Sequence, residues 1–222
     1  MKTCISLISL CLIVLLAGAG LCATESYSYD IPMAATGWTQ DIVLPQFNTA
    51  LGTLNSITLS LNGSILGSFR FENTGSSSGT PTLTTSSLLT IKRLDGTTLL
   101  EANPVASITE TVGPYDGITN FEGTSGRTYN NQPASDSVVL NLLPSSSDFS
   151  LFTGTGNLTL PVSTSGSSWV TGGGNLAVLF LCDTGASGTV IYDYTPVPEP
   201  SGIIAMLAGL TGLAGVVARR RK

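Results

Sequence analysis

The sequence predicts an all-β fold, a β-sandwich of which a jelly roll is one form, between an N-terminal signal helix and a C-terminal transmembrane helix. Three observations support this prediction. Between residues 24 and 196, apolar and polar residues alternate in short segments, and a period of two indicates strands with one buried face. Gly, Asn, Ser and Pro separate these segments, as turn residues do. A long apolar run lies near each end of the chain.

Residues 1–23 have the three parts of a secretory signal peptide. Lys2 provides the basic start, residues 5–16 are apolar, and small residues follow. Cleavage after Ala19 and cleavage after Ala23 both fit this pattern. A lipoprotein signal needs a small residue before Cys22, and the leucine found there makes lipidation the less favoured alternative.

Two dipeptides predict tight hairpins in the region 24–196. Asn62-Gly63 separates the alternating segments 55–62 and 65–71, and Asp95-Gly96 separates 88–94 and 97–102. Both pairs tolerate the positive φ angles of a two-residue turn. Further strands are predicted at 27–31, 38–44, 105–112, 138–143, 151–152, 157–162, 176–182 and 189–194. Residues 72–87 are predicted to be a long loop or a frayed strand, and residues 113–132 to be loops. The total is ten or eleven strands.

The last segment, 197–222, combines a proline-rich start, an apolar run and a basic end. The uncharged run 202–218 would form a transmembrane helix about 25 Å long, near the short limit for spanning a bilayer of about 30 Å. The cations that follow it are predicted to remain in the cytoplasm. They are Arg219, Arg220, Arg221 and Lys222. Pro198 and Pro200 keep the peptide before the helix extended.

Pro198-Glu199-Pro200, the apolar run and the basic cluster, in this order, resemble the PEP-CTERM sorting signal. The resemblance implies an exported protein of a Gram-negative bacterium that passes through the inner membrane, held there by residues 202–218. An exosortase would cleave it near the motif and transfer it to the cell surface or the extracellular matrix. The alternative is an uncleaved single-pass anchor.

The β region also resembles a choice-of-anchor E domain, through short motifs that occur in order along residues 27–195. These motifs are residues 45–48, 51–54, 94–97, 123–126, 152–156 and 160–162. The resemblance implies an extracellular all-β module found with various C-terminal anchors. No activity is assigned to that class, so the resemblance implies fold and export alone.

Composition excludes or disfavours several functions. Residues 25–199 contain 14 acids and four cations, a net charge of −10, which disfavours nucleic-acid binding. The chain has no histidine, the commonest general base and transition-metal ligand. Cys182 would be the one cysteine left after cleavage at Ala23, and it is predicted to be a small buried apolar residue rather than a reactive thiol.

Weaker patterns indicate chemistry that we weigh against ordinary structural roles. Residues 75–79 match G-x-S-x-G, but the pattern lacks a histidine partner. The acid and amide side chains of Asp116, Asn120 and Glu122 are candidate calcium ligands, and solvated loop residues are the simpler interpretation. Two aspartate pairs are considered as glycosidase carboxylates: Asp183 with Asp193, and Asp136 with Asp148.

Aromatic side chains provide a second functional hypothesis. Trp38, Tyr115, Tyr129 and Trp169 could stack on sugar rings if they are exposed, and ordinary packing is the competing interpretation. We predict no catalytic residue, no metal site and no cofactor. The expected function is that of a non-enzymatic structural or interaction module, with a carbohydrate-binding module of the exopolysaccharide matrix as the alternative.

Overall fold

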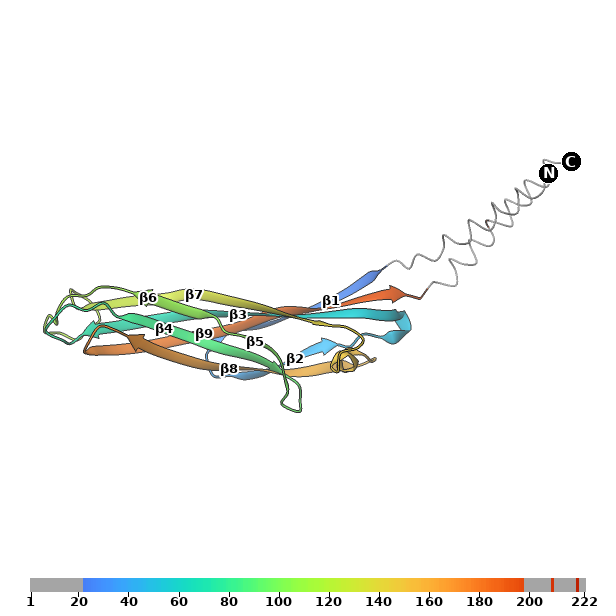
Figure 1. The fold of residues 1–222 in the computed structure, drawn as a ribbon, viewed down its shortest axis with the longest axis horizontal. Helices are drawn as coiled ribbons and strands as arrows, with labels where there is room; N and C mark the ends of the chain where they lie inside the picture. The colour runs from blue at the N-terminus through green and yellow to red at the C-terminus, as the bar shows by residue number, and fades with distance from the viewer. Residues whose placement is uncertain (1–21, 198–208, 210–218, 220–222) are drawn as a thin grey trace.

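The computed structural model describes residues 22–197, together with Gly209 and Arg219. In this part of the chain, nine strands and two short 3-10 turns form a long two-layered sandwich (Figure 1). The first sheet contains, in spatial order, β1 (Ala23–Ala35), β9 (Leu176–Pro196), β3 (Gly52–Asn73) and β7 (Gly126–Leu142). The second contains β2 (Thr39–Pro45), β8 (Asn157–Thr171), β4 (Thr82–Lys92) and β5 (Thr98–Ala102), with β6 (Val105–Thr109) also paired to β4. The turns are η2 (Thr49–Leu51) and η3 (Phe149–Phe152). The predicted all-β fold of two antiparallel sheets is confirmed.

The strand pairs are nested along the chain. β1 pairs with β9, β2 with β8, β3 with β7 and β4 with β5, and all four pairs are antiparallel. Nesting of this kind results when one long antiparallel ribbon folds over into two layers, so that successive pairs alternate between the sheets. It is the connectivity of a jelly roll.

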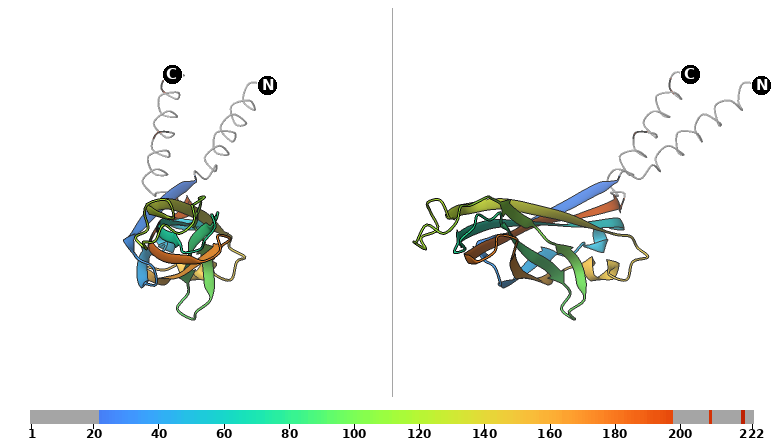
Figure 2. Two further views of the ribbon diagram at one scale, coloured as in Figure 1. Left: turned by 90° about the vertical axis from the view of Figure 1, so that its left-hand side faces the viewer. Right: turned by 60° about the vertical axis from the view of Figure 1, so that its left-hand side comes forward.

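The sandwich has two distinct ends. Ala23 and Tyr194 are register partners, so the first and last strands bring residues 23 and 196 to the same end, which we call the base. The opposite end, the tip, consists of the loops 74–81, 110–125 and 172–175 (Figure 1). Figure 2 (left) looks onto the tip and shows the two sheets curled around a common interior.

Two hydrophobic cores lie between the sheets, one in each half. The core of the base half contains 20 buried apolar residues, including the large rings of Phe47 and Tyr192. The core of the tip half has six: Ile65, Phe69, Phe71, Leu83, Ala106 and Val112. Because both cores and all strand pairs lie within residues 22–197, this segment has the interior contacts of an independently folding domain.

The predicted hairpin at Asn62-Gly63 is wrong, because β3 continues through it as one strand. Apolar side chains of β3 remain buried on both sides of this point, from Ile57 to Phe71. A Cβ at Gly63 would lie 2.7 Å from Leu89 Cδ1 on β4 of the facing sheet. The glycine therefore permits close packing between sheets rather than a turn.

The predicted hairpin at Asp95-Gly96 is confirmed. Gly96 has a φ of 87°, a conformation that glycine adopts readily. The Arg93 N–H donates to the Thr97 carbonyl at 2.8 Å, and the Thr97 N–H donates to Asp95 Oδ1 at 2.9 Å. This turn joins β4 to β5 and projects from the side of the sandwich (Figures 1 and 2).

The Ser- and Thr-rich stretch 82–87, predicted as part of a loop or a frayed strand, forms the first half of β4. The hydroxyl of Thr82 bonds to that of Thr109 at 2.8 Å, and the hydroxyl of Thr84 bonds to that of Ser107 at 3.0 Å. Both partners lie on β6. Side chains that satisfy one another across strands allow a polar sequence to form a sheet. Of the two predicted alternatives, the strand is the one observed from Thr82 onward.

β7 and β9 are longer than predicted. β7 starts at Gly126, within the predicted loop 113–132, and β9 joins the predicted strands 176–182 and 189–194 into one. Gly188 permits this continuity, because a Cβ there would collide with the Ser60 carbonyl and the Tyr29 hydroxyl. The predicted strand at 151–152 belongs to η3. The described part of the chain thus has nine strands instead of ten or eleven.

Several predicted features lie outside the described residues. They are residues 1–21 of the signal peptide, Pro198, Glu199 and Pro200 of the sorting motif, the span 202–218 apart from Gly209, and the basic residues 220–222. Across residues 22–197 and the two single positions beyond them, no helix has the length and apolar character that crossing a bilayer requires.

Candidate functional sites

The chain is held by the sheet up to the residue that precedes the predicted sorting motif. Pro196 is the register partner of Gly52 at the end of the β9–β3 ladder, and the Val197 N–H donates to the Leu51 carbonyl at 3.0 Å. Asn48 caps η2 just before this point, because its Oδ1 accepts a hydrogen bond from the Ala50 N–H. The motif therefore follows directly on a fixed anchor point at the base.

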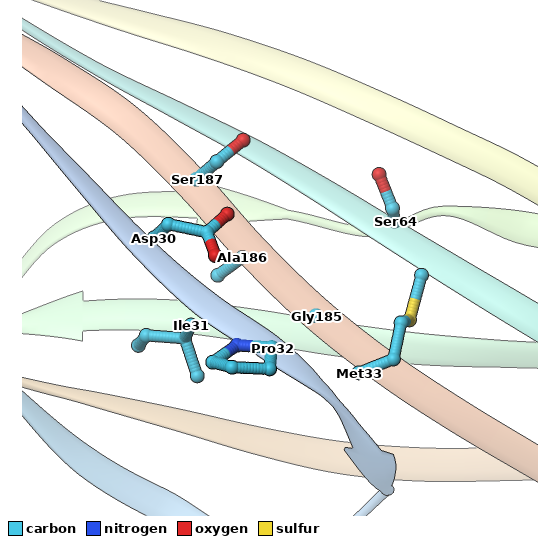
Figure 3. Close-up of a pocket in the computed structure, with 8 residues that line it drawn as sticks. All are labelled: Asp30, Ile31, Pro32, Met33, Ser64, Gly185, Ala186 and Ser187. Atoms are coloured by element: carbon cyan, nitrogen blue, oxygen red, sulfur yellow. The ribbon is translucent and has the colours of Figure 1, made fainter.

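A shallow groove of about 260 Å³ crosses the middle of the first sheet (Figure 3). A bulge in β1 between Ile31 and Ala34 shapes it, and the residues that line it are Asp30, Ile31, Pro32, Met33, Ser64, Gly185, Ala186 and Ser187. Figure 3 shows Met33 extending from β1 across β9 towards Ser64 on β3. The groove offers one carboxylate and two hydroxyl groups, a set suited to hydrogen bonding but not to catalysis by paired acids.

The tip contains a buried carboxylate that the sequence did not reveal. Glu72, at the end of β3, is fully buried, and its Oε2 accepts a hydrogen bond from the Phe121 N–H at 2.7 Å. The Ser125 hydroxyl donates to Glu72 Oε1. Phe121 adopts a φ of 60°, which is uncommon for an aromatic residue and indicates that the loop is tightly constrained. Glu72 thus fixes the loop 110–125 onto the end of the sheet.

Asn73 organises the neighbouring loop of the tip. Its Nδ2 donates to the carbonyls of Ser77 and Gly113, both at 2.7 Å, and its Oδ1 accepts from the Gly75 N–H at 2.9 Å. A polar depression of about 380 Å³ lies beside it, lined by residues 75–79 and 173–175. Because both polar atoms of Asn73 are used internally, its role is to shape this loop.

Two of the three candidate calcium ligands make hydrogen bonds within local turns. Asp116 Oδ1 accepts from the Ile118 N–H at 3.1 Å, and Asn120 Oδ1 accepts from the Glu122 N–H at 3.0 Å. These contacts support the simpler interpretation of Asp116 and Asn120 as loop residues. Among the described residues, no group of three or more His, Cys, Asp and Glu side chains is placed to hold a metal ion.

The candidate catalytic patterns are not assembled into sites. Residues 75–79 lie between β3 and β4, so Ser77 has no helix after it and does not form a nucleophile elbow. Asp183 and Asp193 lie ten residues apart on β9, or about 33 Å at the rise of a strand, whereas paired glycosidase carboxylates lie about 5–10 Å apart.

The second aspartate pair has structural partners. Asp148 forms an ion pair with Arg93, with Oδ1 at 2.9 Å from Nη1. Asp136 Oδ2 accepts a hydrogen bond from the Asn103 N–H at 2.8 Å. Each carboxylate ties two segments of the sandwich together, so neither is free to act as half of a catalytic pair.

The four candidate aromatic residues have different environments. Trp38 is half-buried, and its indole N–H donates to the Thr184 carbonyl at 3.0 Å, which is a packing role. Tyr129 donates to Glu110 at 3.2 Å, and burial together with this carboxylate raises the pKa of its hydroxyl. Tyr115 is exposed in the tip loop and contacts Thr119. Trp169 is 45% exposed on β8 and is the aromatic side chain best placed to meet a ligand.

Trp169 lies on a sheet surface rich in hydroxyl groups. It is the register partner of Thr84 on β4, which bonds in turn to Ser107 on β6. The hydroxyls of Thr80 and Thr111, at 2.9 Å, continue the same row towards the tip. An exposed indole beside aligned hydroxyl groups can combine ring stacking with hydrogen bonding.

Cys182 is less buried than predicted. It is a free cysteine of intermediate exposure that packs against the tip core, one residue beyond Asp183, where the pairing of β9 with β1 ends. Cys22, the other described cysteine, is exposed. The prediction of a buried apolar residue at 182 is therefore corrected to a partly exposed one.

Comparison with protein families identifies the tail. The chain carries a PEP-CTERM protein-sorting motif at residues 196–222. This motif implies an exported protein that an exosortase processes through membrane-associated sorting to the cell surface. The match covers the tail alone, and the resemblance of residues 27–195 to a choice-of-anchor E domain remains a prediction. No curated protein matches the chain.

Several solved structures resemble the chain weakly. Turnip Yellow Mosaic Virus gives a TM-score of 0.22 at 10% identity, over 82% of this chain and 99% of that one. Infectious bursal disease virus, Gt strain, gives a TM-score of 0.13 at 16% identity, over 84% of this chain and 47% of that one. The tailspike protein of Acinetobacter baumannii phage AM24 gives 0.16 at 12% identity, over 81% and 27%. Similarity at this level carries no inference about function.

Proposed function

We propose that this chain is a non-enzymatic protein of the cell surface or extracellular matrix of a Gram-negative bacterium, sorted and cleaved by an exosortase. Its β domain acts as a structural or interaction module. The observation that carries the proposal is the PEP-CTERM motif, which begins where β9 ends at the base of the sandwich. The absence of histidine from the whole sequence supports a role without acid–base catalysis.

The position of the motif suits processing. Residues up to Val197 are fixed by the β9–β3 ladder and by the bond to Leu51. An extended Pro-Glu-Pro peptide leaving this fixed point would reach an enzyme at the membrane without unfolding the sandwich. The residues proposed to be recognised are Pro198, Glu199 and Pro200. Before cleavage, residues 202–218 would hold the chain in the inner membrane, with residues 219–222 on the cytoplasmic side.

The proposal is tested by replacing Pro198, Glu199 and Pro200 together with alanine in the native host. We expect the variant to accumulate in the membrane fraction with its tail attached, while the wild type reaches the surface or matrix. A matched control replaces the exposed residues Pro144 and Glu101 with alanine and should be sorted normally. Normal sorting of the triple variant would contradict recognition through this motif.

Trp169 favours carbohydrate binding as a second candidate function. Its exposed indole lies beside the buried Thr84, whose hydroxyl bonds to that of the exposed Ser107, so the indole and the Ser107 hydroxyl are the groups available to a polysaccharide chain. Binding of residues 22–197 to a glycan array tests this candidate. Saturable binding that Trp169→Ala abolishes, and that Val139→Ala on β7 preserves, would support it. Absence of binding to host exopolysaccharide would eliminate it.

A further inference from the structure

The groove on the first sheet is built by a break in strand pairing (Figure 3). The register between β1 and β9 shifts after Ile31, so that Pro32 and Met33 on β1 stand opposite one residue of β9, Gly185. A bulge of this kind bends its strand and re-aims the side chains that it carries. A Cβ at Gly185 would lie 3.3 Å from Met33 Sδ, so the glycine leaves room for Met33 to lie across β9. The bulge and the glycine together shape the groove.

Three polar side chains reach the groove from three adjacent strands. Asp30 on β1 is the register partner of Ser187 on β9, and Ser64 on β3 is the register partner of Gly185. Register partners project to the same face of a sheet, as do residues two apart on one strand. Asp30 is exposed, whereas Ser64 and Ser187 are half-buried. The groove therefore presents one carboxylate and two hydroxyl groups on the outer face of the first sheet.

The carboxylate of the groove has no cation beside it. Asp30 is the only charged residue that lines the groove in the part of the chain that the structure describes. The ion pairs between described residues all involve Arg93 or Arg127. Arg70 lies six residues along β3 from Ser64, which is about 20 Å at the rise of a strand. The negative charge of Asp30 is therefore available to a ligand.

Charge complementarity selects a ligand that carries an ammonium group. An anion would be repelled by Asp30 and by the whole of residues 22–197, which contain 13 acids and four cations, a net charge of −9. A metal ion needs several oxygen ligands, and no described group of three or more His, Cys, Asp and Glu side chains could hold one. An ammonium group needs a single carboxylate, to which its N–H donates a charge-assisted hydrogen bond.

The other groups of the groove favour a sugar ring as the carrier of that ammonium. Met33 is 42% exposed and, with Pro32, gives the groove an apolar wall that suits the C–H face of a ring. Ser64 and Ser187 can exchange hydrogen bonds with ring hydroxyl groups. A lysine side chain would bring the same charge on a flexible stem, lose more conformational freedom on binding, and leave both serine hydroxyls without a partner. At about 260 Å³, the groove is small enough for one or two sugar units.

We propose that the groove binds an amino sugar unit of a polysaccharide. The ammonium group of the sugar donates to the Asp30 carboxylate, its ring hydroxyls bond to Ser64 and Ser187, and its apolar face rests on Met33. Asp183 is exposed on the same face of β9, four residues or about 13 Å from Ser187, where it meets a second ammonium group of the same polysaccharide.

This site is separate from the surface around Trp169. The groove belongs to the first sheet, whereas Trp169 lies on β8 of the second. The inference rests on the proposed role of the β domain as an interaction module and names a ligand for it. It does not depend on the proposed sorting, which is tested by the location of the variant at Pro198, Glu199 and Pro200.

Calorimetric titration of residues 22–197 with a glucosamine tetramer tests the proposal. The titration is done at about pH 6, where the amines are protonated, and at about 0.15 M salt, which screens non-specific attraction. We expect saturable binding. Asp30→Asn should raise the dissociation constant at least about fivefold, because it removes the charge that the ammonium meets. The N-acetylated tetramer, which lacks the ammonium groups, should bind at least about tenfold more weakly.

The matched control is Asp41→Asn, which removes the same charge from an exposed residue on β2 of the other sheet and should leave the dissociation constant unchanged. Trp169→Ala should also leave it unchanged. Circular dichroism and urea unfolding verify that the variants are folded. In NMR spectra of the wild type, the amide signals of Asp30, Ser64 and Gly185 should shift during the titration.

Four results would overturn the proposal. The first is the absence of saturable binding, and the second is equal binding of the N-acetylated tetramer. The third is equal weakening by Asp41→Asn and Asp30→Asn, which would show attraction to the net charge alone. The fourth is equally tight binding of tetralysine, which would show a basic peptide to be the ligand.

Discussion

The base and tip halves of the sandwich share the long strands β3, β4, β7, β8 and β9 but are held together differently. The base core contains 20 buried apolar residues, and β1 and β2 each add a strand to their sheet in this half. The tip core contains six and relies on the buried side chains of Glu72 and Asn73 to fix its loops. The difference indicates that the base half supplies most of the stability, and that the tip half is where the surface can vary with function.

Core truncation should show the largest contrast between the halves. Phe47 is fully buried against Tyr192 and Tyr194, with ring centroids 5.8 and 5.0 Å away, and Phe47→Ala should cost about 3–5 kcal/mol. Phe180→Ala at the margin of the tip core should lower the free energy of unfolding by about 1–2 kcal/mol, because that side chain is only partly buried. Urea unfolding measures both, and equal losses would contradict the contrast.

Removing the buried carboxylate should loosen the tip more than the base. Glu72→Ala leaves the Phe121 N–H and the Ser125 hydroxyl without their partner and should cost about 2–3 kcal/mol. The loop 110–125 should become sensitive to limited proteolysis. Glu101→Ala, which changes an exposed glutamate on β5, is the control and should have little effect. Unchanged proteolysis of Glu72→Ala would show that the carboxylate does not fix the loop.

Two glycines test the distinction between a close contact and a turn. Gly63→Ala pushes a methyl group against Leu89 between the sheets and should cost about 1–3 kcal/mol. Gly96→Ala has open space but a φ of 87°, so backbone strain alone should cost about 1 kcal/mol. If Gly63→Ala lowers the free energy of unfolding less in a Leu89→Ala background than in the wild type, crowding against Leu89 is the cause. An equal loss in both backgrounds would contradict the crowding explanation.

Alkaline pH should destabilise the base half. Burial raises the pKa of Tyr29 and that of Tyr192 well above the usual value, and each hydroxyl donates at 2.7 Å to a backbone carbonyl. The unfolded chain ionises these groups near pH 10, whereas the folded chain keeps them neutral. The contribution of these two tyrosines to the free energy of unfolding is thus constant below about pH 10 and falls as the pH rises above it. Denaturation at pH 8–12 measures this, and Tyr192→Phe should reduce the alkaline slope.

The sequence predicted the features that depend on local pattern. Alternation in β3 and turn chemistry at Asp95-Gly96 are local, and both predicted the observed structure. Gly63 was misassigned as a turn because its role depends on Leu89, which is distant in sequence. Glu72 was missed for the same reason, since its partners lie about 50 residues away. The hydroxyl pairs of β4 with β6 are likewise formed only by folding.

The candidate sites also differ in whether they depend on local sequence or on residues brought together by folding. The sorting motif is contiguous in sequence and was recognised from Pro198, Glu199, Pro200 and the residues that follow. Trp169 was named as a candidate from its position beside the glycine-rich loop 171–174, and it is 45% exposed. Its neighbours Thr84 and Ser107 come from other strands and could not be named from the sequence. The sequence could not place Asp183 relative to Asp193, and the structure separates them along the single strand β9.

Mass spectrometry of the mature protein from its native host tests the central claim, that this chain is exported cargo cut from its C-terminal tail. The account predicts a C-terminus within residues 198–201, just beyond the end of β9. A mature protein that ends at Lys222 would contradict it.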